Sequence, residues 1–263
     1  MITVAAFDRD GRVHLLEVEP DAAVRGAGRP FAHGLVGETL PDAFLRLDLE
    51  SLHDTPRGRL AFADFRTARS KAPIGCPRSL CRRIVALSES RGLLPLARFE
   101  RGFEPLLEAL DRRRLAVAEG REGRPTVLHV ALAAGEDRAC YLLHHEERRA
   151  LVARIEAVLE HGRPELAPFV GAGARIVPVV VEDRVAFRLD GLERAPDLHV
   201  AAATVLAALL HGLDAPALEP PSAGGTVPAP GDLARALLSE PFVEYYAARV
   251  EGRADSPPVP SPG

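Results

Sequence analysis

The sequence predicts an α+β protein in which a small β-rich N-terminal part precedes a longer part that mixes strands and helices. Two observations lead to this prediction. Short β-rich runs separated by turn residues continue to Phe65. From Pro77 onward, apolar residues recur at helical spacing in several segments. The 263 residues (28.2 kDa) suffice for one large domain or two modest ones.

Four short strands are expected in the N-terminal part. Residues 2–7 and 12–19 flank the turn sequence Asp8-Arg9-Asp10-Gly11, in which Gly11 supplies the positive φ that a tight turn requires. Residues 43–48 and 59–65 are two further strands around a connection that contains Pro56. These runs predict a small β-domain.

The remaining elements follow from the hydrophobic period. A helix begins at Pro77 with proline in its first turn and is closed by Gly92. Other strands are expected at 93–99, 126–133, 175–181 and 184–189, and other helices at 104–114, 145–160, 198–210, 233–238 and 242–250. The helix at 198–210 is almost wholly apolar and should be buried. The end of the chain, 256–263, contains four prolines and is expected to be disordered.

Composition and charge exclude several classes of protein. No stretch approaches the ~18 apolar residues of a membrane span, and the start has no secretory pattern. A net charge of −4 and a pI of about 6.2 give no electrostatic footprint for nucleic acid. Three cysteines without a Cys-x-x-Cys motif argue against a disulfide scaffold or structural zinc, so a cytoplasmic location is expected.

Common catalytic motifs are missing from the chain. There is no Gly-x-Gly-x-x-Gly, phosphate loop, nucleophile elbow or His-Glu-x-x-His. The densest group of potential metal ligands, His144-His145-Glu146-Glu147, is interpreted as a solvated helix start with acidic residues near the positive dipole end. His199 and His211 are expected to be satisfied helix-surface or core histidines. The run Arg112-Arg113-Arg114 is expected on a solvated face.

Six segments carry motifs of one known family in the same order. They are residues 42–52 (similar to “SDxxLxPDxxTL”), 60–64, 76–83 (“xPRxxLRR”), 92–103 (“GxExEF”), 195–213 (“ANPYLALAALLAAGLxGI”) and 242–246 (“FVxYY”). In this order they resemble the glutamine synthetase family, over about residues 1–103 and 184–250.

The resemblance implies a fold and a domain organisation. Residues 1–75 would form a β-grasp-like N-terminal domain. Residues 76–252 would form a truncated catalytic-type domain, in which an antiparallel sheet is backed by helices. Residues 253–263 would be a disordered, proline-rich tail. The shortening falls between Phe103 and Arg184, the interval in which the family builds most of its catalytic sheet and its nucleotide site.

The resemblance also identifies two remnant catalytic positions. Family ligases make an acyl phosphate from ATP and glutamate, which ammonia then attacks, and carboxylates and a histidine hold two or three divalent cations. Glu100 matches the first carboxylate of “GxExEF”, but the second position is Gly102. Arg188 matches the arginine of “xExR”, but the metal-binding Glu is Ala186. One carboxylate cannot hold a two-metal site, so no cofactor is expected, and Glu100 would be the metal ligand only if a metal is retained.

Three hypotheses about function remain. The first is a pseudoenzyme: a glutamine-synthetase-like protein of nitrogen metabolism that has lost ATP-dependent ligase chemistry. It would bind a small ligand, a second copy of itself or an intact glutamine-synthetase-like subunit. The alternative is a divergent carboxylate–amine ligase that uses Mg and ATP, with metal ligands such as His129, Glu146 or Glu182. The third is an unrelated α+β domain, which a parallel doubly wound sheet would indicate.

The surroundings of the two remnant positions can distinguish these hypotheses. If Glu100 and Arg188 belong to one site, they should face one cleft from neighbouring strands. Otherwise Glu100 is a solvated strand end, and Arg188 pairs with Asp190 or Glu193. A polar funnel around these positions would favour the ligase, and a filled apolar interior would favour the scaffold.

Overall fold

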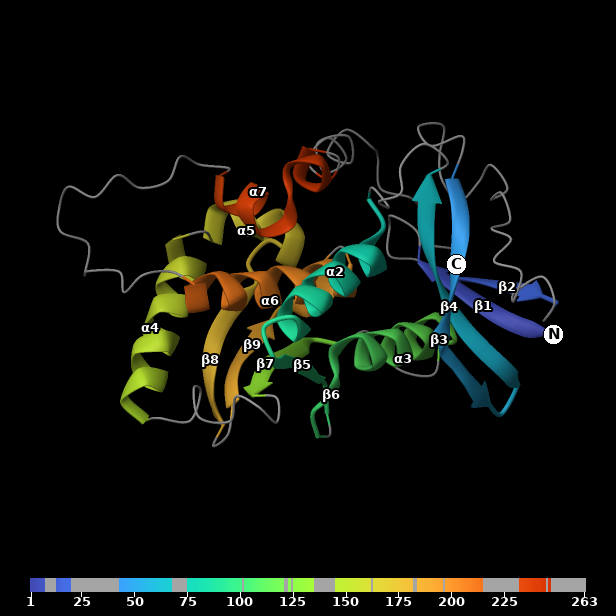
Figure 1. Ribbon diagram of the computed structural model, residues 1–263, viewed down its shortest axis with the longest axis horizontal. Coiled ribbons are helices and arrows are strands. Elements are labelled where there is room, and N and C mark those ends of the chain that lie inside the picture. The colour runs from blue at the N-terminus through green and yellow to red at the C-terminus, as the bar shows by residue number, and fades with distance from the viewer. Residues whose placement is uncertain are drawn as a thin grey trace.

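Two separate β-sheets organise the chain, and the helices gather around the second one (Figure 1). In this computed structural model, the described residues are 1–7, 13–19, 43–67, 75–100, 102–120, 123, 125–134, 145–161, 163–181, 184–195, 197–214, 232–244 and 246. The predicted turn at 8–11 and the predicted tail at 256–263 lie outside the described residues.

The first sheet is formed by the N-terminal strands. They are β1 (Ile2–Phe7), β2 (Val13–Val18), β3 (Ala43–Thr55) and β4 (Gly58–Thr67). Their order is β2-β1-β4-β3, with β1 and β4 parallel at the centre and both outer pairs antiparallel. The β-grasp prediction also requires a helix between β2 and β3, and residues 20–42, where it would lie, are outside the described part of the chain.

The second sheet is antiparallel throughout. Its strands are β5 (Leu93–Arg98), β6 (Glu104–Pro105), β7 (Val127–Ala134), β8 (Arg175–Val181) and β9 (Arg184–Asp190). They are ordered β6-β5-β7-β9-β8. The sheet is therefore not parallel and doubly wound, and the predicted α+β class with an antiparallel sheet backed by helices is confirmed.

Helices cover one face of the second sheet. They are α2 (Pro77–Glu89), α3 (Leu106–Ala118), α4 (His145–His161), α5 (Arg163–Val170), α6 (Leu198–Asp214) and α7 (Asp232–Leu238), with a short 3₁₀ helix at Leu192–Arg194. At the centre of this layer, α6 packs against α2, α4, α5 and α7 (Figure 1). Its apolar, alanine-rich surface is buried as predicted, since small side chains let neighbouring helices approach closely.

Most predicted elements are present, with differences at their ends. The helix expected at 104–114 begins at Leu106, because Glu104 and Pro105 pair with β5 as β6. The strand expected at 43–48 continues to Thr55 through a bulge. Helix α5 was not predicted: it contains Pro168, which weakens a helical pattern. No helix among the described residues is long and apolar enough to span a membrane.

Candidate functional site

The face of the second sheet opposite the helices carries one of the two remnant positions. Along a strand, side chains alternate between the two faces. On β7, Leu128, Val130 and Leu132 belong to the main core beneath the helices. The alternate residues His129 and Ala131 therefore point to the other face, which we call the open face.

Three basic side chains form a row across the open face. Arg98 on β5 is in register with His129 on β7, which is in register with Arg188 on β9. Partial burial and the charges of Arg98 and Arg188 lower the pKa of His129, and the opposing effect of Asp190 is smaller. His129 is therefore a neutral imidazole between two guanidiniums at neutral pH.

An apolar cluster lies directly beside this row. Leu96, Ala131 and Ala186 are in register on β5, β7 and β9 and are buried together, with the Phe103 ring packed against them. Ala186, which the sequence resemblance aligns with a metal-binding Glu, is 1% exposed. The open face is thus filled by apolar side chains at this position.

Two guanidiniums border the apolar cluster. The Cζ atoms of Arg98 and Arg184 lie 6.0 Å and 4.9 Å from the centroid of the Phe103 ring. Cations at this distance from an aromatic ring are attracted by its quadrupole. The surroundings of Phe103 are therefore cationic, which favours an anion over a metal ion.

The two remnant residues have separate partners. Arg188 is 46% exposed and donates to Oδ2 of Asp190 from Nε (3.2 Å) and Nη2 (3.0 Å). Glu100, beyond the end of β5, is 72% exposed and accepts a 2.9 Å hydrogen bond from Nη2 of Arg113 on α3. Since β7 separates β5 from β9, neighbouring strands do not bring Glu100 and Arg188 together.

Metal ligands do not gather in the described part of the chain. Among those residues, no three His, Cys, Asp or Glu side chains are placed to hold one metal ion. Of the alternative ligands, His129 lies on the open face, whereas Glu182 and the side chain of Glu146 are outside the described residues. In the segment His144-His145-Glu146-Glu147, the backbone of the last three residues is described, while their side chains and all of His144 lie outside the described part of the chain.

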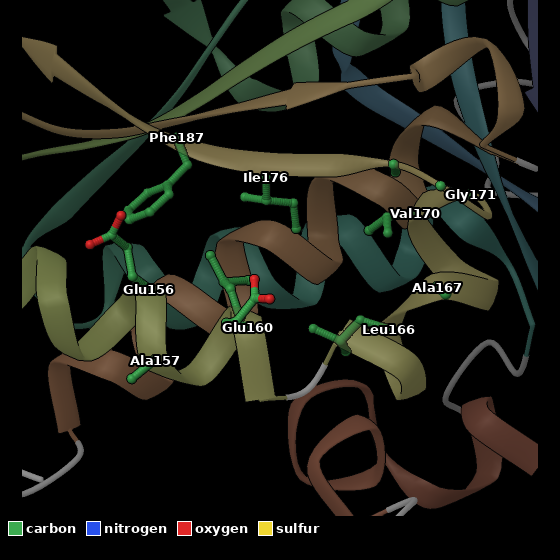
Figure 2. A pocket seen from close by; sticks show the side chains of 12 residues that line it. Glu156, Ala157, Glu160, Leu166, Ala167, Val170, Gly171, Ile176 and Phe187 are labelled. Atoms are coloured by element: carbon green, nitrogen blue, oxygen red, sulfur yellow. The ribbon is translucent and has the colours of Figure 1, made fainter. Parts of the chain in front are cut away.

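Three cavities in the described part of the chain are not lined by Arg188. Two hollows of about 420 and 540 Å³ share Glu100 and Arg113 in their linings. A third, of about 360 Å³, lies on the helix side, where Ile176, Val170 and Leu166 point into it and Glu156 projects from α4 (Figure 2). No predicted site residue lines this third cavity.

The structure also contains a group of buried charges that the sequence interpretation missed. We call it the inter-sheet charge cluster, because it joins the first sheet to the helices on the second. Its members are Asp48, Asp64, Arg78, Arg82, Asp111, Arg114, Asp197 and His199.

Arg78 is the centre of this cluster. It is 2% exposed and contacts three carboxylates. Nη1 donates to Asp64 (2.8 Å), Nη2 to Asp48 (2.8 Å) and Nε to Oδ2 of Asp111 (3.0 Å). Burial alone would lower the pKa of Arg78, but the charges of Asp111 and Asp64 outweigh it and raise the pKa. The guanidinium is permanently charged and ties α2 to α3 and to the first sheet.

The other end of the cluster lies at the start of α6. Oδ1 of Asp197 accepts the backbone N–H groups of His199 (2.7 Å) and Val200 (3.1 Å), which caps the helix. Its Oδ2 lies 2.6 Å from Nη2 of Arg114. Burial would raise the pKa of Asp197, but Arg114 and His199 lower it to about 2. Asp197 is therefore a carboxylate throughout the neutral range.

The inter-sheet charge cluster contradicts the expected exposure of Arg114 and agrees with the expected core position of His199. Arg114 is buried and paired, so the run Arg112-Arg113-Arg114 does not lie on one solvated face. Successive helical residues point about 100° apart, which separates exposed Arg112 from buried Arg114. His199 lies in the core and His211 is exposed at the helix surface, as expected, but only Nε2 of His199 is hydrogen-bonded, to Asp111, and its Nδ1 has no hydrogen-bond partner among the described residues.

Comparison with known proteins supports the fold. No protein-family model matches the sequence, and no curated protein matches it significantly. Among solved structures, one of apo GmaS without ligand superposes with a TM-score of 0.62 at 13% identity, over 98% of this chain and 94% of that one. Plasmodium falciparum glutamine synthetase gives 0.58 at 9% identity, over 81% and 72%. A structure described as a novel glutamine synthase homolog gives 0.54 at 16%, over 96% and 94%.

These similarities extend over most of each chain, while sequence identity is low. The chain therefore has the glutamine synthetase-like fold that the six segments predicted. At such identities, the similarity concerns the fold, and function has to be argued from the open face itself.

Proposed function

We propose that this glutamine-synthetase-like chain does not carry out ATP-dependent ligase chemistry and instead binds a small organic anion on the open face. The observation that carries the proposal is the apolar cluster of Leu96, Ala131 and Ala186 beneath Phe103. A hard cation such as Mg²⁺ keeps its waters unless several anionic oxygens replace them, and methyl groups and an aromatic ring offer none.

The basic row supplies what an anion requires. A guanidinium can form two parallel hydrogen bonds with a carboxylate or phosphate, and Arg98 and Arg188 flank His129 on adjacent strands. The neighbouring apolar cluster can contact the carbon skeleton of such a ligand. A carboxylate on a short apolar chain therefore fits both parts of the open face.

Nucleotide titration tests the first half of the proposal. We expect no heat on titration of ATP with magnesium up to millimolar concentration, and no phosphate release with ATP, glutamate and ammonium. Magnesium-dependent ATP binding would instead support the divergent ligase, in which neutral His129 would be a ligand available on the open face.

Titration with glutarate tests the second half. We expect saturable changes in the NMR signals of the Arg98, His129 and Arg188 side chains. Arg188→Gln should weaken the apparent affinity about tenfold, because it removes a charge-assisted hydrogen bond. Arg59→Gln, on an exposed arginine of the first sheet, is the matched control and should bind like the parent. Equal binding by both variants would contradict this site.

Assembly and location belong to the same proposal. We place the protein in the cytoplasm, in agreement with the free, buried thiols of Cys76 and Cys81. Burial raises the pKa of the Cys76 thiol to about 11, so it is a neutral, unreactive group. The proposed macromolecular partner is a second copy or an intact glutamine-synthetase-like subunit, and light scattering of the chain alone and mixed with such a subunit tests this.

A further inference from the structure

The charges of the inter-sheet charge cluster do not balance unless one further proton is bound. Four carboxylates (Asp48, Asp64, Asp111, Asp197) face three guanidiniums (Arg78, Arg82, Arg114) and the imidazole of His199. Counted over these described residues, a neutral imidazole leaves one negative charge uncompensated, and an imidazolium cancels it. Of these side chains only Arg82 is substantially exposed, so solvent screens an imbalance poorly.

His199 lies between two carboxylates. Its ring is 0% exposed, with Nε2 2.8 Å from Oδ1 of Asp111 and Nδ1 3.7 Å from Oδ1 of Asp197. Only the Nε2 contact is short enough for a hydrogen bond. At 3.7 Å the carboxylate of Asp197 attracts the ring electrostatically when the ring carries a charge, which a neutral imidazole does not. The arrangement therefore favours the protonated ring.

Among the described elements packed around His199, no charged group opposes its protonation more strongly than Asp111 and Asp197 favour it. From α3 it faces Asp111 and, beyond Asp197, Arg114. From α2 the nearby groups are Arg78, which is bound to Asp111, and Cys81, whose pKa burial raises so that it stays a neutral thiol. From β1 the ring of Phe7 packs at a centroid distance of 4.6 Å, a contact that favours a cation.

Asp111 connects this proton to the first sheet. Its carboxylate accepts from His199 and from Nε of Arg78, whose other nitrogens hold Asp48 on β3 and Asp64 on β4. Protonation of His199 therefore affects the same group of charges that holds the two sheets together.

We propose that His199 is the proton-controlled part of a latch between the first sheet and the helices of the second: the imidazolium keeps the latch closed, and loss of its proton loosens the contact. This proposal is independent of any ligand on the open face.

The direction of the pH dependence follows from the surroundings of His199. Burial would lower its pKa, but Asp111 and Asp197 outweigh burial and raise it. A raised pKa in the closed state means that the full stabilisation is present below the ordinary value of about 6.5. Above that pH, the closed state is the one that still binds the proton, so the opening equilibrium rises about tenfold per pH unit until the pH passes the raised value.

NMR and hydrogen exchange on the full chain test the latch. We expect ¹⁵N shifts of the His199 ring to show both nitrogens protonated at pH 6, with exposed His211 on the same helix as the internal reference. Amide exchange in β4 and at the start of α2, corrected for intrinsic base catalysis, should accelerate about tenfold per pH unit above about pH 6.5. The radius of gyration should increase over the same range.

Two variants separate the latch from general alkaline loosening. His199→Gln cannot carry the proton and should lose the pH dependence of exchange, while His211→Gln should keep it. If His199→Gln does not fold, the wild-type ring shifts decide the matter. A singly protonated His199 ring at pH 6, or pH-independent exchange while the ring loses its proton, would overturn the proposal.

Discussion

Arg78 on α2 and Asp64 on β4 are joined by a 2.8 Å hydrogen bond from Nη1 to Oδ1, which crosses from the helical layer to the first sheet. The same guanidinium reaches Asp48 on β3 and Asp111 on α3, so one side chain connects its own helix to three other elements. A planar guanidinium has N–H donors on both edges and can therefore bind several carboxylates at once. We expect that no other cationic side chain can replace Arg78.

Arg78→Lys should destabilise the protein strongly. A lysine ammonium is a single point charge and leaves at least one buried carboxylate without its partner. We expect a loss of about 3–5 kcal/mol in the free energy of unfolding, measured by urea titration followed by circular dichroism. The matched change Arg82→Lys, one turn along α2 at a side chain 35% exposed, should cost less than about 1 kcal/mol. Similar losses of unfolding free energy for both variants would show that the planar guanidinium of Arg78 is not required.

The sequence predicted the helices and strands better than the side-chain contacts between them. Local spacing predicts the helix at 77–89 and the turn at Gly92, where φ is +70°, and both were found where predicted, with Leu80 and Ile84 buried; Leu87, which has the same helical spacing, is exposed instead. Pairing of Asp48, Arg78, Asp111 and His199 depends on how distant segments pack, and each residue alone resembles an ordinary surface charge. Three of them, Asp48, Arg78 and His199, lie inside segments that carry the family resemblance, which was the one available signal.

The candidate site was predictable only in part. The absence of the second carboxylate and the replacement of Glu by Ala186 could be seen in the sequence. That Phe103 packs against Ala186, Ala131 and Leu96 could not, because it depends on how the chain after β5 returns over the sheet. The basic row was missed for a similar reason, since the register of β5, β7 and β9 decides which side chains are neighbours.

Acid should weaken the protein through Asp197. Its pKa is about 2 in the folded state, against 3.8 for the ordinary side chain. A carboxyl with a lowered folded pKa contributes stability that is present above the ordinary value and is lost as the pH falls through the folded one. We expect the unfolding free energy to decrease by about 2 kcal/mol from this group between about pH 4 and pH 2.

Asp197→Asn isolates that contribution. The amide oxygen can still accept the N–H groups of His199 and Val200, so the helix cap is kept while the charge opposite Arg114 is removed. Urea titrations at several pH values should show a shallower acid dependence in the variant than in the parent. Parallel curves would mean that Asp197 has an ordinary pKa in the folded protein.

Gly212→Ala should test the close packing of α6 on α4. A Cβ at this position would lie 2.4 Å from Cγ1 and 3.2 Å from Cα of Ile155, which is fully buried. The gain of about 1 kcal/mol in helix propensity is smaller than the cost of overpacking a branch carbon and the backbone of its neighbour. We expect a net loss of about 1–2 kcal/mol in unfolding free energy.

A double-mutant cycle distinguishes this clash from other effects. Ile155→Ala alone should cost about 2–5 kcal/mol through the cavity it leaves, and it should cost less when Gly212 is already Ala. Gly102→Ala, where a Cβ meets nothing within 4 Å, is the control and should change stability by less than about 0.5 kcal/mol. Additive losses would place the two helices further apart than described here.

Ala186→Glu should fail to restore a metal site, although it returns the carboxylate of the family motif. The new side chain enters the apolar cluster beneath Phe103, which the guanidiniums of Arg98 and Arg184 border, and no second carboxylate lies among the neighbours described. We expect a loss of about 3 kcal/mol in unfolding free energy, because burying a carboxylate without adequate partners is costly. Ala186→Gln has the same size without the charge and should lose less unfolding free energy.

Thermal unfolding of both variants with and without millimolar magnesium tests whether a metal site is restored. The melting temperature of Ala186→Glu should not respond to the metal. A rise in that temperature with magnesium, absent in Ala186→Gln, would mean that oxygen ligands remain around this position, and the divergent ligase would then be the better hypothesis.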